Sequence, residues 1–280
     1  MLTVQRSSSL NRDAIENHLT TRSLGRRIEW HHRLDSTNRE AVALGQAGAE
    51  HGTLVLADAQ TAGRGRLART WFSPPGVNLY ASLVVRTTIE AQGLAAWLSW
   101  LPLMAALAAA EAIDTVRSVN VAVKWPNDLL INGRKVGGIL CESATAPGAG
   151  SFQVIGMGIN VNGEATDFPE ELREIATTIR QETGHVIDRN RLIAQVLLEL
   201  EACLDEFLVR GAERIALAYR RRCTTIGRTV KAVLADGKVC IGVAEGINQD
   251  GSLTLVESAA TGQLTATVRQ LRAADIVHLR

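Results

Sequence analysis

The feature that most constrains the fold is a run of uncharged residues from Leu94 to Ala110, which is rich in alanine and leucine. A helix that is apolar on every side must be buried, either in lipid or in the centre of a large protein core. The run contains Pro102 and is shorter than the ~20 residues that a bilayer requires. It therefore predicts a core helix over about Gly93–Val116, inside a domain large enough to enclose it, and no membrane span.

Composition places the chain among globular proteins. Of its 280 residues, 46% are hydrophobic and 21% are charged, which excludes disordered, collagen-like and coiled-coil chains. The net charge is +1, which argues against bulk binding of nucleic acid or of an anionic membrane. The cysteines and histidines show no metal-ligand spacing. Widely spaced cysteines predict reduced thiols in a cytoplasmic protein.

The pattern of apolar residues divides the chain into three parts. Residues 1–27 are polar and rich in arginine, and they are expected to form a flexible leader too short for a helix-turn-helix domain. Residues 28–224 mix helical and strand patterns. Residues 225–280 hold short alternating runs separated by Asp-Gly turns, which are typical of a small barrel or sandwich. The sequence thus predicts an α+β fold, with a large domain followed by a small all-β domain.

An arginine-rich loop follows the second predicted strand. Gly63 and Gly65 would let backbone N–H groups approach a ligand closely. No acidic residue lies between Asp58 and Glu90, so four arginines lack a local counter-charge: Arg64, Arg66, Arg69 and Arg86. Such a group is typical of a site for phosphate or carboxylate, although it lacks the Gly-Lys-Ser/Thr ending of a P-loop. The alternative is a flexible surface loop, and composition alone does not separate the two.

A second polar cluster surrounds a predicted hairpin. Lys124-Trp-Pro-Asn-Asp128 precedes Asn132-Gly133, a dipeptide suited to the positive φ angles of a type I′ turn, and Lys135 follows. Both lysines and the carboxylate could point to one end of a sheet, where a compact ammonium can follow a developing negative charge. Asp128 could bind a metal ion, orient an amine or accept a proton. The alternative is a polar hairpin tip with a structural Trp-Pro pair.

Taken together, four motifs resemble those of the biotin–protein ligases. They are Ser36-Thr37-Asn38 at a helix start, Gly-Arg-Gly-Arg from Gly63 on to Trp71, Lys124–Asp128 with its Arg134–Ile139 sequel, and Ile155–Asn160. Their order and spacing also match, over roughly residues 28–280. The resemblance implies a catalytic domain with a mixed sheet of the biotin/lipoate ligase type at residues 28–224, and an SH3-like barrel at residues 225–280.

The resemblance also implies an ATP-dependent reaction in two steps. Biotin and ATP, accompanied by Mg²⁺, first give biotinyl-5′-AMP and pyrophosphate. A lysine of a biotin carboxyl carrier domain, from acetyl-CoA carboxylase or a related carboxylase, then takes the biotin and releases AMP. Two anionic reactants meet in the first step, so the site needs clustered cations. With a leader of 27 residues, a monofunctional ligase without sequence-specific DNA binding is expected.

Roles follow position by position from the same resemblance, with no metal ion held by the protein alone. The catalytic residues would be Lys135, Arg66, Asp128 and Lys124. The biotin-binding residues would be Ser36, Thr37, Asn38, Gln60, Gly63, Arg64, Gly65, Arg66, Lys135 and Gly138. Contacts to ATP or the adenylate would come from Arg64, Arg66, Arg69, Trp71, Asn127, Lys135 and Asn160, with Trp71 stacking on adenine.

One position departs from the family pattern. Ala68 stands where the family usually has glycine, which is tolerable if its φ is negative and would alter the ordering of the loop if its φ is positive. Two alternatives to the biotin ligase are a lipoate–protein ligase or octanoyltransferase of the same fold, and a non-catalytic biotin-binding module. The Gly-Arg-Gly-Arg and Lys-Trp-Pro-Asn-Asp motifs speak against the first, and an intact Lys135, Arg66 and Asp128 against the second.

Two surfaces are candidates for contacts with other molecules. Strands near Val77–Arg86 and Val154–Ile159 could lie at a sheet edge and support a homodimer. The stretch Arg210–Lys231 holds seven basic residues and one acid, Glu213. It is best interpreted as a solvated helix end that could meet an acidic carrier domain.

Overall fold

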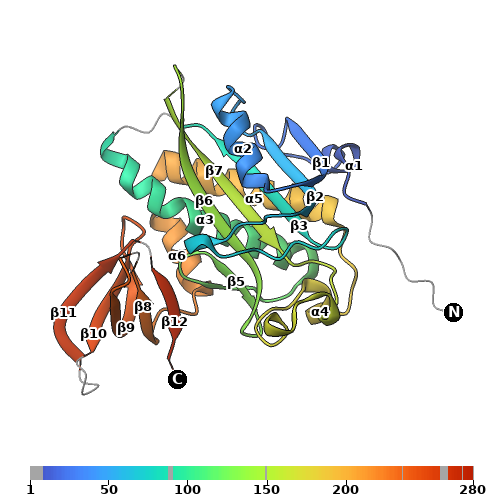
Figure 1. Ribbon diagram of the computed structural model, residues 1–280. Helices are drawn as coiled ribbons and strands as arrows, with labels where there is room; N and C mark the ends of the chain where they lie inside the picture. Colours follow the sequence, from blue (N-terminus) through green and yellow to red (C-terminus); the bar gives the residue numbers. More distant parts are fainter. Residues whose placement is uncertain are drawn as a thin grey trace.

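The computed structural model describes residues 9–87, 91–148, 150–234, 236–258, 264–272 and 274–279. Its strands form two sheets (Figure 1): seven strands in the order β1-β2-β3-β7-β6-β5-β4, and five in the order β11-β10-β9-β8-β12. In the large sheet β1 and β2 are parallel, whereas β2 pairs with β3 and β3 with β7 in antiparallel fashion. The fold is therefore α+β with a mixed large sheet, as the sequence and the resemblance predicted.

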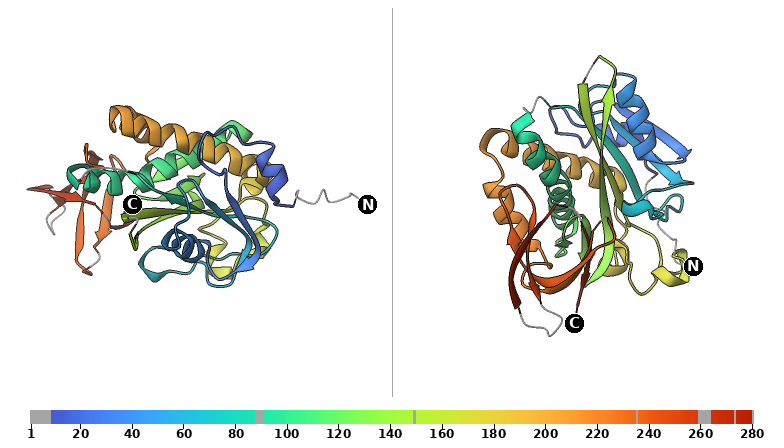
Figure 2. Two further views of the ribbon diagram at one scale, coloured as in Figure 1. Left: turned by 90° about the horizontal axis from the view of Figure 1, so that it is seen from above. Right: turned by 60° about the vertical axis from the view of Figure 1, so that its left-hand side comes forward.

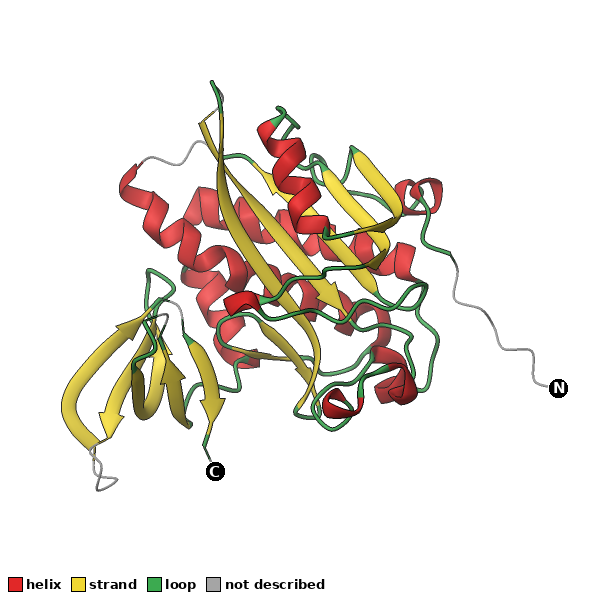
Figure 3. Cartoon of the chain, in the orientation of Figure 1, coloured by secondary structure: helices red, strands yellow, loops and turns green. Residues whose placement is uncertain are grey.

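Helices cover both faces of the large sheet, as the colouring of Figure 3 makes plain. Because both faces are covered, all seven residues of the interior strand β3 are buried. The strands are β1 (Ile28–Leu34), β2 (Leu54–Gln60), β3 (Leu79–Val85), β4 (Ala122–Lys124), β5 (Asp128–Ile131), β6 (Arg134–Ala146) and β7 (Gly150–Ile159). The helices are α1 (Arg12–Glu16), α2 (Thr37–Gln46), α3 (Ala91–Arg117), α4 (Ile179–Thr183), α5 (Arg189–Arg210) and α6 (Glu213–Arg222).

The core lies mainly between α3, α5 and one face of the sheet, and α2 covers the opposite face (Figure 2). By length and composition, Gly93–Arg117 could cross a membrane. In the fold, however, α3 packs against α5, α6 and β6, and Trp97 and Trp100 are fully buried. The uncharged run is thus the central helix of the larger core, as predicted.

The segment before β1 is packed against the core. Leu10, Ile15 and Leu24 are buried there, and α1 contacts α5. The carboxylate of Glu201 on α5 accepts hydrogen bonds from the backbone N–H groups of residues 22, 23 and 24. The expectation of a flexible leader is therefore wrong for residues 9–27, while residues 1–8 lie outside the described part of the chain. The three buried residues are isolated apolar positions in a polar segment, so the sequence shows no helical periodicity there.

The order of the strands also corrects the proposed dimer surface. Strand β3 lies between β2 and β7, and β7 lies between β3 and β6. The strands predicted near Val77–Arg86 and Val154–Ile159 are thus interior, and in the described sheet the edges are β1 and β4. Apolar alternation locates strands along the chain but does not say which strands are neighbours.

The small sheet is antiparallel throughout and follows α6. Its strands are β8 (Thr229–Val233), β9 (Val239–Ile247), β10 (Leu253–Ser258), β11 (Leu264–Leu271) and β12 (Asp275–His278). The indole of Trp100 donates to Gln249 O, and the Arg220 guanidinium donates to Ile247 O, so the sheet is tied to α3 and α6. The last strand, β12, pairs with β8. This pairing places the start of β12 beside the large domain.

Candidate active site

The floor of the candidate site is a row of paired residues that crosses several strands of the large sheet. Lys124 on β4 pairs with Asp128 on β5, Asp128 with Gly138 on β6, and Gly138 with Gly158 on β7. Directly paired residues of neighbouring strands project from the same face of a sheet. The row therefore presents a lysine, a carboxylate and two bare glycines side by side.

Trp71 lies on the glycine part of this floor. A Cβ atom at Gly158 would be 2.6 Å from the Trp71 ring, and one at Gly138 would be 3.5 Å from it. Only residues without a side chain allow such an approach. The indole Nε1 is buried and lacks a hydrogen-bond partner among the described residues. A buried donor without a partner is costly, so this atom is a candidate contact for a ligand acceptor.

The ammonium of Lys135 joins the two halves of the floor. It lies 2.6 Å from Asp128 Oδ1 and 5.5 Å from the centre of the Trp71 ring. Burial lowers the pKa of the neighbouring Lys124, while the charge of Asp128 opposes that shift. The predicted catalytic hairpin thus gathers two lysines and one carboxylate at one end of the sheet, and its Asn132-Gly133 turn has positive φ at both residues, as expected.

A chain of hydrogen bonds links the start of α2 to the floor. The Gln60 side-chain oxygen accepts from the backbone N–H and hydroxyl of Thr37, and its amide donates to Ser73. Ser82 on β3 donates to Thr37 and to Asn38 Oδ1. These side chains are a fixed set of small donors and acceptors, as recognition of a neutral polar group requires.

Ser36 is the N-cap residue of α2, as predicted, but its side chain makes no capping hydrogen bond. It is buried, with 1% of its surface exposed. The hydroxyl is therefore not used in the way that makes serine common at helix starts. A buried hydroxyl beside the Thr37–Gln60 chain is a candidate ligand contact.

The arginine-rich loop folds as a small hairpin between β2 and β3. Arg64 bridges to Thr70, Gly65 N–H donates to Arg69 O at 2.7 Å, and Trp71 N–H donates to Gly63 O at 2.9 Å. At its tip, Leu67 and Ala68 have φ of 53° and 58°. Ala68 is thus left-handed, the condition under which an alanine disfavours the ordered loop.

Two of the four arginines pair with acids in the folded structure. Arg64 pairs with Glu142 on β6 at 2.9 Å, and Arg69 pairs with Asp275 on β12. Both acids come from parts of the chain far from the loop, where no local count could find them. Arg86 lies away from the site, donating to Gly45 O and Ala49 O and covering the Phe152 ring. Its role is structural.

Arg66 is the most enclosed cation of the loop. Its guanidinium donates to Asn127 Oδ1 and to Ala274 O, both at 3.1 Å, and burial lowers its pKa. Asn127 in turn donates to Ile139 O at 2.6 Å. The predicted contacts Arg66 and Asn127 are therefore joined, beside the hairpin that carries Asp128.

Asn160, predicted to contact adenine, has a structural role. The residue is 4% exposed, and its side-chain amide donates to Thr177 O. Its backbone carbonyl accepts from Ile179 N–H. Lys135 N–H also donates to Ile175 O. Together these bonds hold residues 175–179 beside Lys135. An adenine contact at Asn160 stays a prediction.

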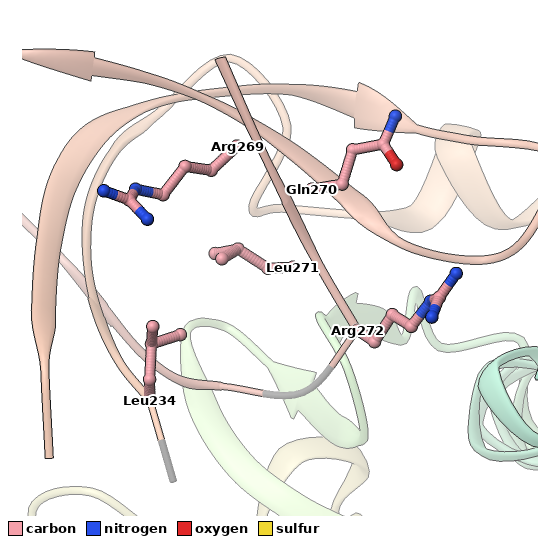
Figure 4. A pocket seen from close by; sticks show the side chains of 5 residues that line it. All are labelled: Leu234, Arg269, Gln270, Leu271 and Arg272. Atoms are coloured by element: carbon pink, nitrogen blue, oxygen red, sulfur yellow. The ribbon is translucent and has the colours of Figure 1, made fainter. Parts of the chain in front are cut away.

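Two further observations concern other parts of the structure. The structure contains a cavity of about 610 Å³ between the end of β8 and β11, lined by Leu234, Arg269, Gln270, Leu271 and Arg272 (Figure 4). It contains no predicted site residue, and its arginines pair with Glu257 and Asp250. Among the described residues, no group of three or more His, Cys, Asp or Glu side chains could hold a metal ion.

Comparison with known proteins gives the family. The sequence profile of the biotin/lipoate A/B protein ligase family matches residues 27–162. A biotin--[acetyl-CoA-carboxylase] ligase of Mycobacterium tuberculosis is 36% identical over 251 residues, 88% of this chain and 86% of that protein. The chain belongs to the biotin/lipoate A/B protein ligase family. A bifunctional ligase/repressor BirA of Bacillus subtilis is likewise 36% identical, over 90% of this chain and 76% of that protein.

The structural likeness agrees with this family membership. The biotin protein ligase from Aquifex aeolicus, solved in complex with biotin and ATP, has a TM-score of 0.74 and 27% sequence identity. It covers 91% of this chain and 99% of its own. Within the family, the Mycobacterium tuberculosis relative and the Aquifex aeolicus neighbour are biotin ligases.

Proposed function

We propose that this chain is an ATP-dependent biotin–protein ligase that forms biotinyl-5′-AMP and then transfers biotin to a lysine of a carrier domain. The observation that carries the proposal is the Lys135–Asp128 ion pair, 2.6 Å long, at the end of a glycine floor covered by Trp71. The indole lies in contact with this floor, so biotin would bind there with Trp71 displaced outward as its cover. A carboxylate at its end would meet the Lys135 ammonium.

In the first step, two anions must react. An oxygen of the biotin carboxylate attacks the α-phosphorus of ATP, the bond from that phosphorus to the bridging oxygen breaks, and pyrophosphate leaves. Lys135 and Arg66 provide fixed positive charge at this point, and Arg66 is already held by Asn127. Because both cations are partly buried, their charge acts in a medium of lower dielectric than water.

In the second step, an uncharged lysine amine of the acceptor attacks the acyl carbon and the bond to AMP breaks. The amine must lose a proton. Asp128 is the carboxylate within reach of the reacting end of biotin, and we assign it the roles of orienting the amine and accepting that proton. Lys124 faces Asp128 across the β4–β5 pair. Its charge lies beside the position where the acceptor amine would meet Asp128.

For biotin recognition, we assign the ureido ring to the network at the start of α2. Thr37, Gln60, Ser82 and Asn38 offer fixed donors and acceptors there, and Ser36 offers a hydroxyl without a capping bond.

The position of Trp71 on the glycine floor favours a role as the cover over biotin. This differs from the adenine stacking that the family resemblance implied. Arg64 and Arg69 frame the loop on either side.

Mg²⁺ is proposed to enter with ATP. The described residues gather no cluster of potential ligands, and this fits an ion bound chiefly by the phosphates of the nucleotide, as Mg²⁺ commonly is. Asp128 is the side chain that would contribute to holding it. The ion would supply positive charge against the negative charge of the phosphates.

The proposed acceptor is the biotin carboxyl carrier domain of acetyl-CoA carboxylase or a related carboxylase. We also propose a cytoplasmic location, and the four free cysteines support it: Cys141, Cys203, Cys223 and Cys240.

Near the end of α5, the basic residues Arg210 and Arg214 both pair with Glu206. This supports a solvated helix end there.

The function is tested by incubating the protein with biotin, ATP, Mg²⁺ and a purified carrier domain, followed by avidin blotting. We expect biotin on the acceptor only when all components are present. Parallel reactions with lipoate separate the biotin ligase from a lipoate ligase of the same fold. Labelling by lipoate and not by biotin, or binding of biotin without transfer, would overturn the proposal.

A further inference from the structure

The first residues of β12 reach across from the small sheet to the arginine-rich loop. Ala274 O accepts a hydrogen bond from Arg66 at 3.1 Å. The Asp275 carboxylate binds both terminal guanidinium nitrogens of Arg69, with Nη1 to Oδ1 at 3.3 Å. More than 200 residues separate the partners of each pair along the chain. We call the Arg69–Asp275 pair the interdomain clasp.

We propose that Asp275 is a positioning residue for the ligase reaction: through the interdomain clasp it holds the loop of residues 63–71 closed over the site before substrates bind. The kinetic part of this proposal rests on the proposed function. The ordering of the loop does not, because it can be measured without any substrate.

The loop needs an anchor outside itself. Leu67 and Ala68 at its tip are both left-handed, a conformation that costs energy for residues other than glycine. Leu67 is 55% exposed, so its side chain contributes little packing to offset that cost. Local backbone bonds such as Gly65 N–H to Arg69 O close the hairpin but do not attach it to the protein.

The two legs of the hairpin are tied to different sheets. The first leg is held by Arg64, which pairs with Glu142 on β6 at 2.9 Å. The second leg is held by Arg69, through the interdomain clasp to β12. Trp71 follows Arg69 by two residues and lies on the glycine floor. Release of the second leg would therefore loosen the part of the loop that covers the biotin slot.

Asp275 is well placed to be the fixed partner. It pairs with Val233 on β8, so its backbone is held in the small sheet. Its side chain is 28% exposed, whereas that of Arg69 is 63% exposed. The charges of Lys124 and Arg66 also lie near Asp275. An effect of Asp275 through those catalytic cations must therefore be distinguished from an effect through the loop.

The direct test is limited trypsin digestion of the unliganded full-length protein, since trypsin cleaves after Arg64, Arg66 and Arg69. We expect Asp275→Ala to raise the rate of cleavage within residues 63–71 about fivefold, the upper range for a partly exposed ion pair. The melting temperature should stay near that of the wild type. Asp236→Ala is the matched control, because it removes an exposed ion pair with Lys238 from the same sheet. It should leave loop cleavage unchanged.

Kinetic measurements and a second substitution distinguish two ways in which Asp275 could act. It could hold the loop of residues 63–71, or its charge could act on the cations Lys124 and Arg66. Asp275→Ala should raise KM for biotin about fivefold with kcat within about twofold. Asp275→Glu should retain most of the protection, and adding Ala68→Gly to Asp275→Ala should restore both protection and KM, because glycine removes the cost at the tip. Unchanged cleavage in Asp275→Ala would overturn the proposal, as would a fall in kcat that Ala68→Gly does not rescue. If the wild type does not ligate biotin, the proposed function is wrong. The trypsin digestion would still decide whether Asp275 holds the loop closed.

Discussion

The ammonium of Lys135 lies 2.6 Å from the carboxylate of Asp128 and stands over the ring of Trp71 at 5.5 Å. In one contact, the residue assigned to the first reaction step meets the residue assigned to the second, beside the side chain assigned to cover biotin. The contact is possible because Asp128 pairs with Gly138, which has no side chain to separate them.

Replacing Lys135 should stop adenylate formation without unfolding the protein. We expect Lys135→Ala to lower the rate of biotin-dependent ATP–pyrophosphate exchange by roughly 10²–10³-fold, the effect of removing one charged donor from a reacting group. The Lys135 side chain is 36% exposed, so the free energy of unfolding should change by less than ~1 kcal/mol. Lys238→Ala removes a lysine from an ion pair in the small sheet and is the control. Exchange at the wild-type rate in Lys135→Ala would contradict the assignment.

Adding a methyl group to the glycine floor should block the biotin slot. The Cβ of Gly158→Ala would lie 2.6 Å from the Trp71 ring, so the indole must move off the floor. We expect the affinity for biotin to fall about tenfold or more, by calorimetry, which corresponds to ~1.4 kcal/mol of overpacking. Gly246→Ala is the control, because a Cβ there meets none of the described atoms within 4 Å. Equal affinities in the two variants would show that Trp71 does not cover the slot.

Glycine at the tip of the arginine-rich loop should stabilise the protein. Ala68 has φ of 58°, and glycine adopts this conformation without the penalty that alanine carries. We expect Ala68→Gly to raise the free energy of unfolding, measured in urea, by up to about 1 kcal/mol. Ala47 has φ of −79°, so the same substitution there should be neutral or destabilising. A loss of stability in Ala68→Gly would mean that the loop is open in the unliganded protein.

The packed N-terminal segment should make the protein sensitive to acid. Burial alone would raise the pKa of Glu201, but N–H donors from residues 22–24 and the Ser23 hydroxyl together lower it to about 2, against an ordinary value of 4.5. The unfolded chain therefore binds the proton first as the pH falls. The stabilisation is complete above pH 4.5 and is lost between pH 4.5 and about 2.

Glu201→Gln measures this contribution. We expect it to lower the free energy of unfolding at pH 7 by roughly 3 kcal/mol and to flatten the acid side of the stability curve. Glu199→Gln, on the same helix and bonded to Gln195, is the control. A steep acid dependence that survives in Glu201→Gln would assign the effect to other carboxylates.

Sequence reasoning located those parts of the site that are local in the chain. Gly133 has φ of 80° in the turn that the sequence predicted. The Lys124–Asp128 motif and Lys135 do meet at one end of the sheet. Short motifs carry this information because turn geometry and strand register act over a few residues. The uncharged helix was found in the same way, from its own composition.

The parts that sequence reasoning missed depend on contacts between distant segments. Glu142 and Asp275 neutralise arginines that are 78 and 206 residues away, and neither acid lies in a recognisable pattern. The interior position of β3 and β7 follows from strand order, which alternation does not encode. Leu10 and Leu24 are single apolar residues whose burial depends on α5. Only the folded structure brings these pairs together.

In the proposed reaction, biotin passes through an adenylate on its way to a carrier lysine. The most direct measurement is to incubate the protein with biotin, Mg²⁺ and ATP labelled on the α-phosphate, and to separate the products before and after a carrier domain is added. We expect labelled biotinyl-5′-AMP that forms only with biotin and is converted to AMP on addition of the acceptor, as biotin appears on the carrier. An adenylate that forms with lipoate in place of biotin, or no adenylate with either, would contradict the proposed reaction.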